Sequence, residues 1–257
     1  MKYLMAVVSV LFAASCSTIK VERDRVEEIR RVAVVGFDVK QEVPPGLEGL
    51  FGSSPKPDTP FAQTKVLGFA EERDHSSRMY SELEKQLQKE LKWQIKDRRA
   101  VADQAIYKKL FEKNTQGLQN RPIVNENIQI YGTTGILDAW PIQRMSSSER
   151  QQLCKDLGVD AIVVADINVA VRNGGGLKKL IGAGDFKPQA TLVFSVYTAD
   201  RNEPVWQDSA ARGEEEEGTG HMLGITNQKA LDQKTVLAAQ SAYQKLFARF
   251  KEETARK

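Results

Sequence analysis

Histidine and cysteine are the side chains that most often bind metals or act as nucleophiles, and this chain of 257 residues has two of each. His75 and His221 are far apart, and neither lies in an HExxH motif, which places two zinc ligands on one helix face. The sequence also lacks the GxSxG turn of many serine hydrolases. We therefore expect no metal site, no cofactor and no enzymatic activity, with both histidines in solvent-facing loops.

Two further segments have compositions typical of ion-binding loops. Residues 174–184 are rich in glycine but contain neither GxxxxGK[ST] nor GxGxxG, so we predict a flexible connector rather than a phosphate loop. The acidic run Glu214–Glu217 is typical of a solvated loop. The 37 basic and 34 acidic side chains nearly cancel, which provides no basic face for nucleic acid. We expect no nucleic-acid partner.

The amino-terminal segment has the order of features found in signal peptides. Lys2 precedes an apolar run from Leu4 to Ala14, and small residues follow. This run has 11 residues, whereas a helix needs about 20 to span a bilayer. We therefore predict a cleaved signal peptide over residues 1–15 rather than a permanent membrane helix.

The end of this segment, Ala13-Ala14-Ser15-Cys16, resembles the lipobox of bacterial lipoproteins. It departs from that pattern at Ala13, where the family favours leucine. The resemblance implies that Cys16 is acylated and becomes the first residue of the mature chain, and Ser17 after it implies export to the outer membrane, with the body facing the periplasm. The alternative is an ordinary secretory peptide that leaves Cys16 as a free thiol.

The rest of the chain alternates between strand and helix patterns. Residues 16–30 are highly charged and are expected to form a tether between the lipid and the body. Strands are predicted around Val32–Val35, 159–172, 189–199 and 205–212, and amphipathic helices over 76–91, 98–114, 146–157 and in the C-terminal segment. Ser146 and Glu149 have capping-box spacing, and Cys154 follows the helix's apolar pattern, which predicts a buried, inert thiol.

Two segments interrupt this order. Residues 43–70 contain five prolines, which neither a helix interior nor a central strand accepts. Residues 115–140 contain several glycines and little apolar sequence, so we predict a second irregular insertion there. Together these strand, helix and insertion patterns predict one α/β domain over 31–257, with a mixed sheet covered by helices and two surface insertions.

This order of elements resembles that of the curli-secretion (CsgG-like) lipoproteins, the peptidoglycan-synthase activator lipoproteins and the TolB amino-terminal domain. The similar positions are the strand with AVVGFD, the Gly158-Val159-Asp160-Ala161 entry to the central strand, and the hairpin ending at Trp206. The resemblance implies a role in envelope assembly, transport or regulation through protein partners. The alternative that it leaves open is a subunit of a homo-oligomeric secretion assembly.

Overall fold

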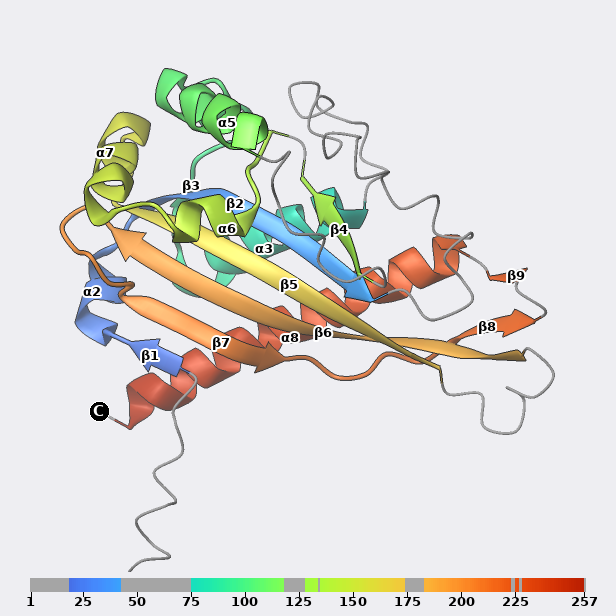
Figure 1. The fold of residues 1–257 in the computed structure, drawn as a ribbon. Coiled ribbons are helices and arrows are strands. Elements are labelled where there is room, and N and C mark those ends of the chain that lie inside the picture. Colours follow the sequence, from blue (N-terminus) through green and yellow to red (C-terminus); the bar gives the residue numbers. More distant parts are fainter. Residues whose placement is uncertain are drawn as a thin grey trace, which may run out of the picture.

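The structure is a computed structural model that describes residues 19–42, 75–117, 128–133, 135–173, 183–222, 225–226 and 228–256 (Figure 1). These residues form an α/β fold with a mixed sheet and a long C-terminal helix, so the predicted fold class is confirmed. None of the helices in these ranges is both long enough and apolar enough to cross a membrane.

The described strands form one nine-stranded sheet. Its main path has the order β1-β7-β6-β5-β2-β3, while β4 pairs with β2, and β8 pairs with β6 and β9. The central pair, β2 and β5, is parallel, as is β2 with β3, and the other pairs are antiparallel. The strands are β1 (Ile19–Val21), β2 (Arg31–Glu42), β3 (Gln94–Ile95), β4 (Ile128–Gly132), β5 (Ala161–Asn173), β6 (Ala183–Thr198), β7 (Trp206–Arg212), β8 (Thr219–Met222) and β9 (Ile225–Thr226).

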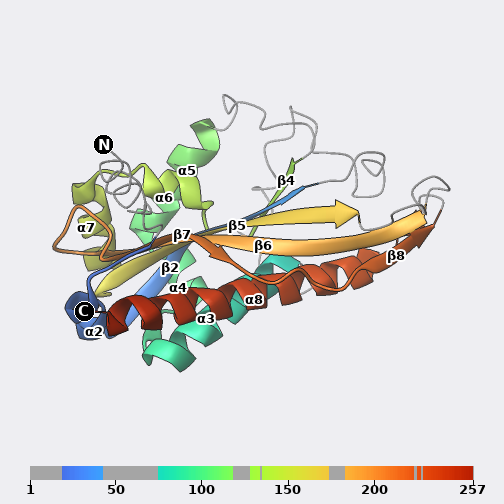
Figure 2. The same ribbon diagram turned by 90° about the horizontal axis from the view of Figure 1, so that it is seen from below.

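Helices cover both faces of this sheet. In Figures 1 and 2, α3 and α8 lie on one face, and α5, α6 and α7 lie on the other. The first face holds the aromatic centre of the core, where the fully buried Trp206 packs edge-on against Phe194 of β6 and contacts Phe247 and Phe250 of α8. The helices are α2 (Arg23–Glu28), α3 (His75–Leu91), α4 (Arg98–Ala102), α5 (Ala105–Gly117), α6 (Ala139–Gln143), α7 (Ser147–Leu157) and α8 (Gln228–Ala255).

The local signals at α7 and β5 are confirmed. The hydroxyl of Ser146 accepts the backbone N–H of Glu149, and the carboxylate of Glu149 accepts the backbone N–H of Ser146, which completes the capping box. Gly158 ends the helix with φ of 64°, a left-handed conformation that favours glycine. The chain then enters β5, whose first seven residues are buried, as expected of a central strand between two helical layers.

Two expectations about irregular segments are corrected. Residues 19–28, expected within the tether, form β1 and α2, because their few apolar side chains pack into the body. Within the expected second insertion, residues 115–117 end α5, residues 128–132 form β4 along β2, and Ala139 begins α6, so these parts of 115–140 are regular rather than irregular. The first insertion, 43–70, lies outside the described residues.

Candidate functional site

The segment that follows Cys16 in the chain is docked on the edge of the sheet. Strand β1 pairs antiparallel with β7, with Ile19 opposite Asp208 and Val21 opposite Trp206. The N–H of Glu22 continues this pairing by donating to the carbonyl of Val205 at 2.8 Å. The folded sheet therefore begins three residues after position 16.

Apolar contacts hold the same segment from beneath. Val21, Val26 and Ile29 are each 2% exposed and belong to the main hydrophobic cluster. Burial of three such side chains contributes on the order of 1.5–3 kcal/mol each. This burial holds β1 and α2 against the sheet. The two elements therefore belong to the folded domain and not to a flexible tether.

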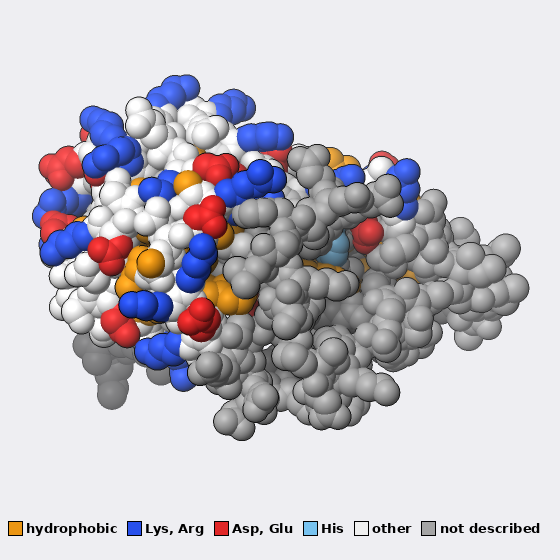
Figure 3. Space-filling model, turned by 90° about the horizontal axis from the view of Figure 1, so that it is seen from above, with side chains coloured by type: hydrophobic (Ala, Val, Ile, Leu, Met, Phe, Trp, Pro, Cys, Tyr) orange, Lys and Arg blue, Asp and Glu red, His pale blue; other side chains and the backbone are white. Residues whose placement is uncertain are grey.

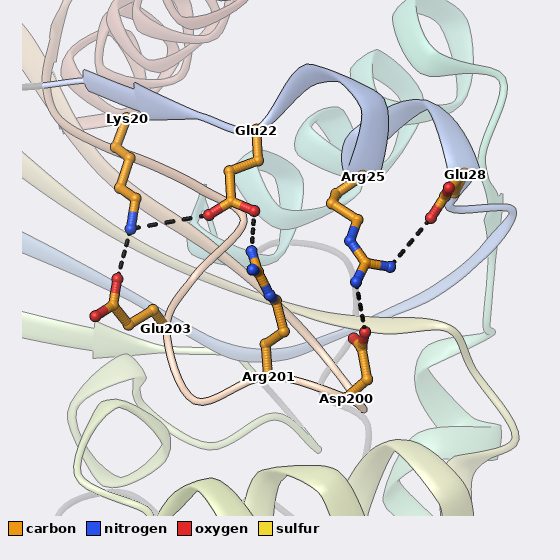
Figure 4. Close-up of polar contacts among 7 residues, drawn as sticks. All are labelled: Lys20, Glu22, Arg25, Glu28, Asp200, Arg201 and Glu203. Atoms are coloured by element: carbon orange, nitrogen blue, oxygen red, sulfur yellow. Dashed lines mark hydrogen bonds and ion pairs between the residues drawn. The ribbon is translucent and has the colours of Figure 1, made fainter.

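An ion-pair network ties the outer side of this segment to the turn between β6 and β7 (Figure 4). Each basic side chain contacts an acidic one across the gap, and every pair is exposed to solvent. A single surface ion pair contributes about 1 kcal/mol or less, so the network specifies register more than it stabilises the fold. The pairs are Lys20 with Glu203 at 2.5 Å and with Glu22 at 3.9 Å, Arg201 with Glu22, and Arg25 with Asp200 at 3.1 Å and with Glu28 at 3.2 Å.

The C-terminal end of α8 completes this part of the molecule. The guanidinium of Arg23 in α2 donates to the carbonyl of Thr254 at 3.3 Å. Beside it, Nε of Arg249 lies 2.7 Å from Oδ2 of the fully buried Asp208 in β7. We call the surface formed by residues 19–28, 200–208 and 249–255 the anchor flank, because it surrounds the point where the chain from Cys16 enters the fold.

A second polar cluster lies in the middle of the sheet, on the face that carries α6. Asp38 of β2 and Asp166 of β5 are directly opposite each other in the parallel register. The ammonium of Lys40, two residues along β2, donates to Asp166 and lies 3.6 Å from Asp38. The first N–H of α6, from Ala139, donates to Asp38 at 2.8 Å. This cluster joins β2, β5 and α6.

Burial controls the electrostatics of the cluster. Asp38 is 2% exposed. This burial, with the negative charges of Asp166 and Asp138 beside it, raises the pKa of Asp38 to about 7, although Lys40 and the Ala139 N–H oppose the shift. Asp38 therefore keeps its proton to a higher pH than an exposed aspartate does.

This cluster was not predicted from the sequence, although the residue pattern contained a signal for it. Asp38 and Lys40 occupy alternate positions in the second half of β2, after Gly36. Asp166 interrupts the apolar run of β5. Polar residues inside such runs must find partners in the fold. What the sequence could not supply was the register of β2 against β5. Among the described residues, no group of His, Cys, Asp and Glu side chains is placed to hold a metal ion.

The predictions for the cysteines and histidines are confirmed in part and corrected in part. Burial raises the pKa of Cys154 to about 12, so the prediction of a buried, inert thiol is confirmed. His75 does not face solvent: it begins α3, is 9% exposed, and its ring centroid lies 4.4 Å from that of Tyr131, because β4 packs over the start of the helix. The backbone of His221 is in β8. Cys16 lies outside the described residues.

The structure also describes part of the two segments whose compositions are typical of ion-binding loops. The acidic run lies in a segment without helix or strand, and Glu214, Glu215 and Glu217 are exposed, as predicted for a solvated loop. Glu215 also lies 3.4 Å from Arg172 and 3.8 Å from Lys187. Of the glycine-rich segment 174–184, only Ala183 and Gly184 are described, and they begin β6 rather than forming a loop.

Comparison of the chain with protein-family profiles, with curated proteins and with solved structures gave no match.

Proposed function

We propose that this chain is a lipid-anchored binding or scaffold protein of the cell envelope that acts through protein partners. In this proposal Cys16 carries the lipid, the outer membrane holds the lipid, and the body faces the periplasm. One observation supports the proposal most strongly: a signal-like segment ends in Ala-Ala-Ser-Cys16, and the folded sheet begins three residues later. A lipid at that position would hold a rigid domain directly at a membrane.

The partner surface in this proposal includes the two insertions, 43–70 and 115–140. The second of these ends at Trp140 in α6, which is 45% exposed and stacks beneath the guanidinium of Arg144 at 4.4 Å. Exposed tryptophan and arginine side chains are enriched among the residues that dominate binding energy at protein interfaces. Trp140 is therefore the described side chain that best fits a partner contact.

The charges on this side of the molecule also fit a protein partner. Figure 3 shows basic and acidic side chains interspersed over the described part of the face that carries α5, α6 and α7. A mixed surface of this kind provides no extended field of one sign, which a polyanion would require. Recognition would then depend on local contacts such as Trp140.

Crosslinking in cells tests the proposal. A tagged full-length protein is crosslinked, extracted in detergent and analysed by mass spectrometry beside Cys16→Ala, Trp140→Ala and Leu237→Ala variants. Leu237 of α8 is a matched control, because it is also large, apolar and 42% exposed. We expect one distinct envelope protein with the wild type and Leu237→Ala, and a clear loss with Cys16→Ala and Trp140→Ala.

Other outcomes contradict this proposal. Capture of the same protein at equal yield by all four forms would show that neither the anchor nor Trp140 contributes. Self-crosslinked species alone would instead favour the homo-oligomeric secretion assembly, and the mass of the detergent complex would then give its stoichiometry.

A further inference from the structure

The chain between Cys16 and the folded domain is too short to act as a spacer. A polypeptide spans at most about 3.3–3.6 Å per residue. Cys16 and Ile19 are separated by three residue steps, so their Cα atoms lie within about 11 Å of each other in any conformation. Ile19 is itself fixed, because β1 is paired with β7.

Several independent contacts prevent β1 from detaching to lengthen this connection. Val21 is buried under the edge of the sheet, and α2 after it buries Val26. Lys20 and Arg25 are paired with the turn after β6 (Figure 4). Release of the segment would expose these side chains together, so the attachment point is part of the rigid body.

We infer that the anchor flank, residues 19–28, 200–208 and 249–255, is the surface that faces the membrane. This inference rests on the proposed lipid at Cys16. An acylated cysteine places its hydrocarbon chains in the bilayer, so the headgroup region lies next to the residue that carries them. With about 11 Å of chain at most, the part of the domain around Ile19 must then lie against the lipid headgroups.

The amino-terminal end of the long C-terminal helix must point away from the membrane. Helix α8 runs from Gln228 to Ala255, and only its last residues, 249–255, belong to the anchor flank. At 1.5 Å per residue, Lys229 lies roughly 30 Å along the helix axis from Arg249. The first turns of α8 are therefore held clear of the lipid.

The charges of the flank indicate what sets this orientation. Lys20, Arg25 and Arg201 are each already paired with a carboxylate of the same flank. Paired charges of both signs give little net attraction to anionic lipid. The orientation should therefore depend on the length of the connection and change little with the fraction of anionic lipid.

Fluorescence quenching by lipid headgroups tests the inference. The lipidated full chain is reconstituted into vesicles of phosphatidylethanolamine and phosphatidylglycerol that contain a lipid with a nitroxide headgroup. A fluorophore is placed on Gln207→Cys in β7, opposite Lys20, or on Lys229→Cys in the first turn of α8; both side chains are exposed. The native Cys154 is buried. We expect most of the fluorescence of the Gln207 label to be lost and that of the Lys229 label to be retained.

A longer connection is the control. Ten glycine and serine residues inserted between Ser17 and Thr18 add roughly 18 Å of average reach, and we expect them to abolish most of the quenching at Gln207. Equal quenching of the two labels, or stronger quenching at Lys229, in an acylated protein would overturn the orientation alone. A protein that has no acyl chains and does not sediment with vesicles would overturn the proposed function, and the orientation with it.

Discussion

Replacing Arg249 by methionine is expected to lower the free energy of unfolding by about 3–5 kcal/mol. Asp208 is fully buried in β7, and Nε of Arg249 lies 2.7 Å from its Oδ2. Its other carboxylate oxygen accepts the N–H of Ala210 at 3.0 Å. Without the guanidinium, a buried carboxylate keeps one backbone hydrogen bond and no counter-charge from α8.

Urea unfolding followed by tryptophan fluorescence measures this loss. Lys251→Met is the matched control, because Lys251 pairs with Glu90 at 2.8 Å but is 67% exposed, and its loss should cost about 1 kcal/mol or less. Combining Arg249→Met with Asp208→Asn should recover much of the stability by removing the unpaired charge. If Arg249→Met and Lys251→Met were equally mild, the pair would not be what holds α8 on the anchor flank.

The second large effect is a pH dependence centred on Asp38. An aspartate has a pKa near 3.9 in an unfolded chain, and burial raises that of Asp38 to about 7 in the fold. Between these values the folded state binds the proton more tightly than the unfolded state. Stability from this group is therefore complete below about pH 4, falls as the pH rises towards 7, and changes little above that.

Asp38→Asn removes this dependence while it keeps an acceptor for the Ala139 N–H. From pH 5 to pH 8, the variant should gain about 2–3 kcal/mol in stability relative to the wild type. Unfolding curves at several pH values measure the difference. Glu84→Gln allows the same pH dependence to be measured at a second site, because burial also raises the pKa of Glu84 to about 7. Parallel stability profiles for Asp38→Asn and the wild type would contradict a buried, proton-binding Asp38.

The elements that could be predicted from sequence are those specified by local patterns. Helix α7 was predicted within a residue at each end, because Ser146, Glu149 and Gly158 provide a cap at each terminus. Strand β5 was predicted because a continuous apolar run between two turn signals has few alternatives in an α/β protein.

The elements that were missed depend on long-range pairing. Only Ile19 and Val21 mark β1, and the strand forms because β7, far along the chain, presents an open edge. Strand β4 is likewise specified by its pairing with β2. The Asp38 and Asp166 cluster needed the same kind of information, namely which residues of two distant strands lie opposite each other. A pattern within one segment does not contain that register.

The lipid at Cys16 is the central claim, since both the anchoring and the orientation depend on it. Mass spectrometry of the N-terminal peptide, from protein extracted out of purified membranes, tests the claim most directly. We expect a peptide that begins at Cys16 and carries acyl chains, and we expect Cys16→Ala to yield none. A peptide that begins at another residue, or that contains Cys16 with an unmodified thiol, would contradict the claim.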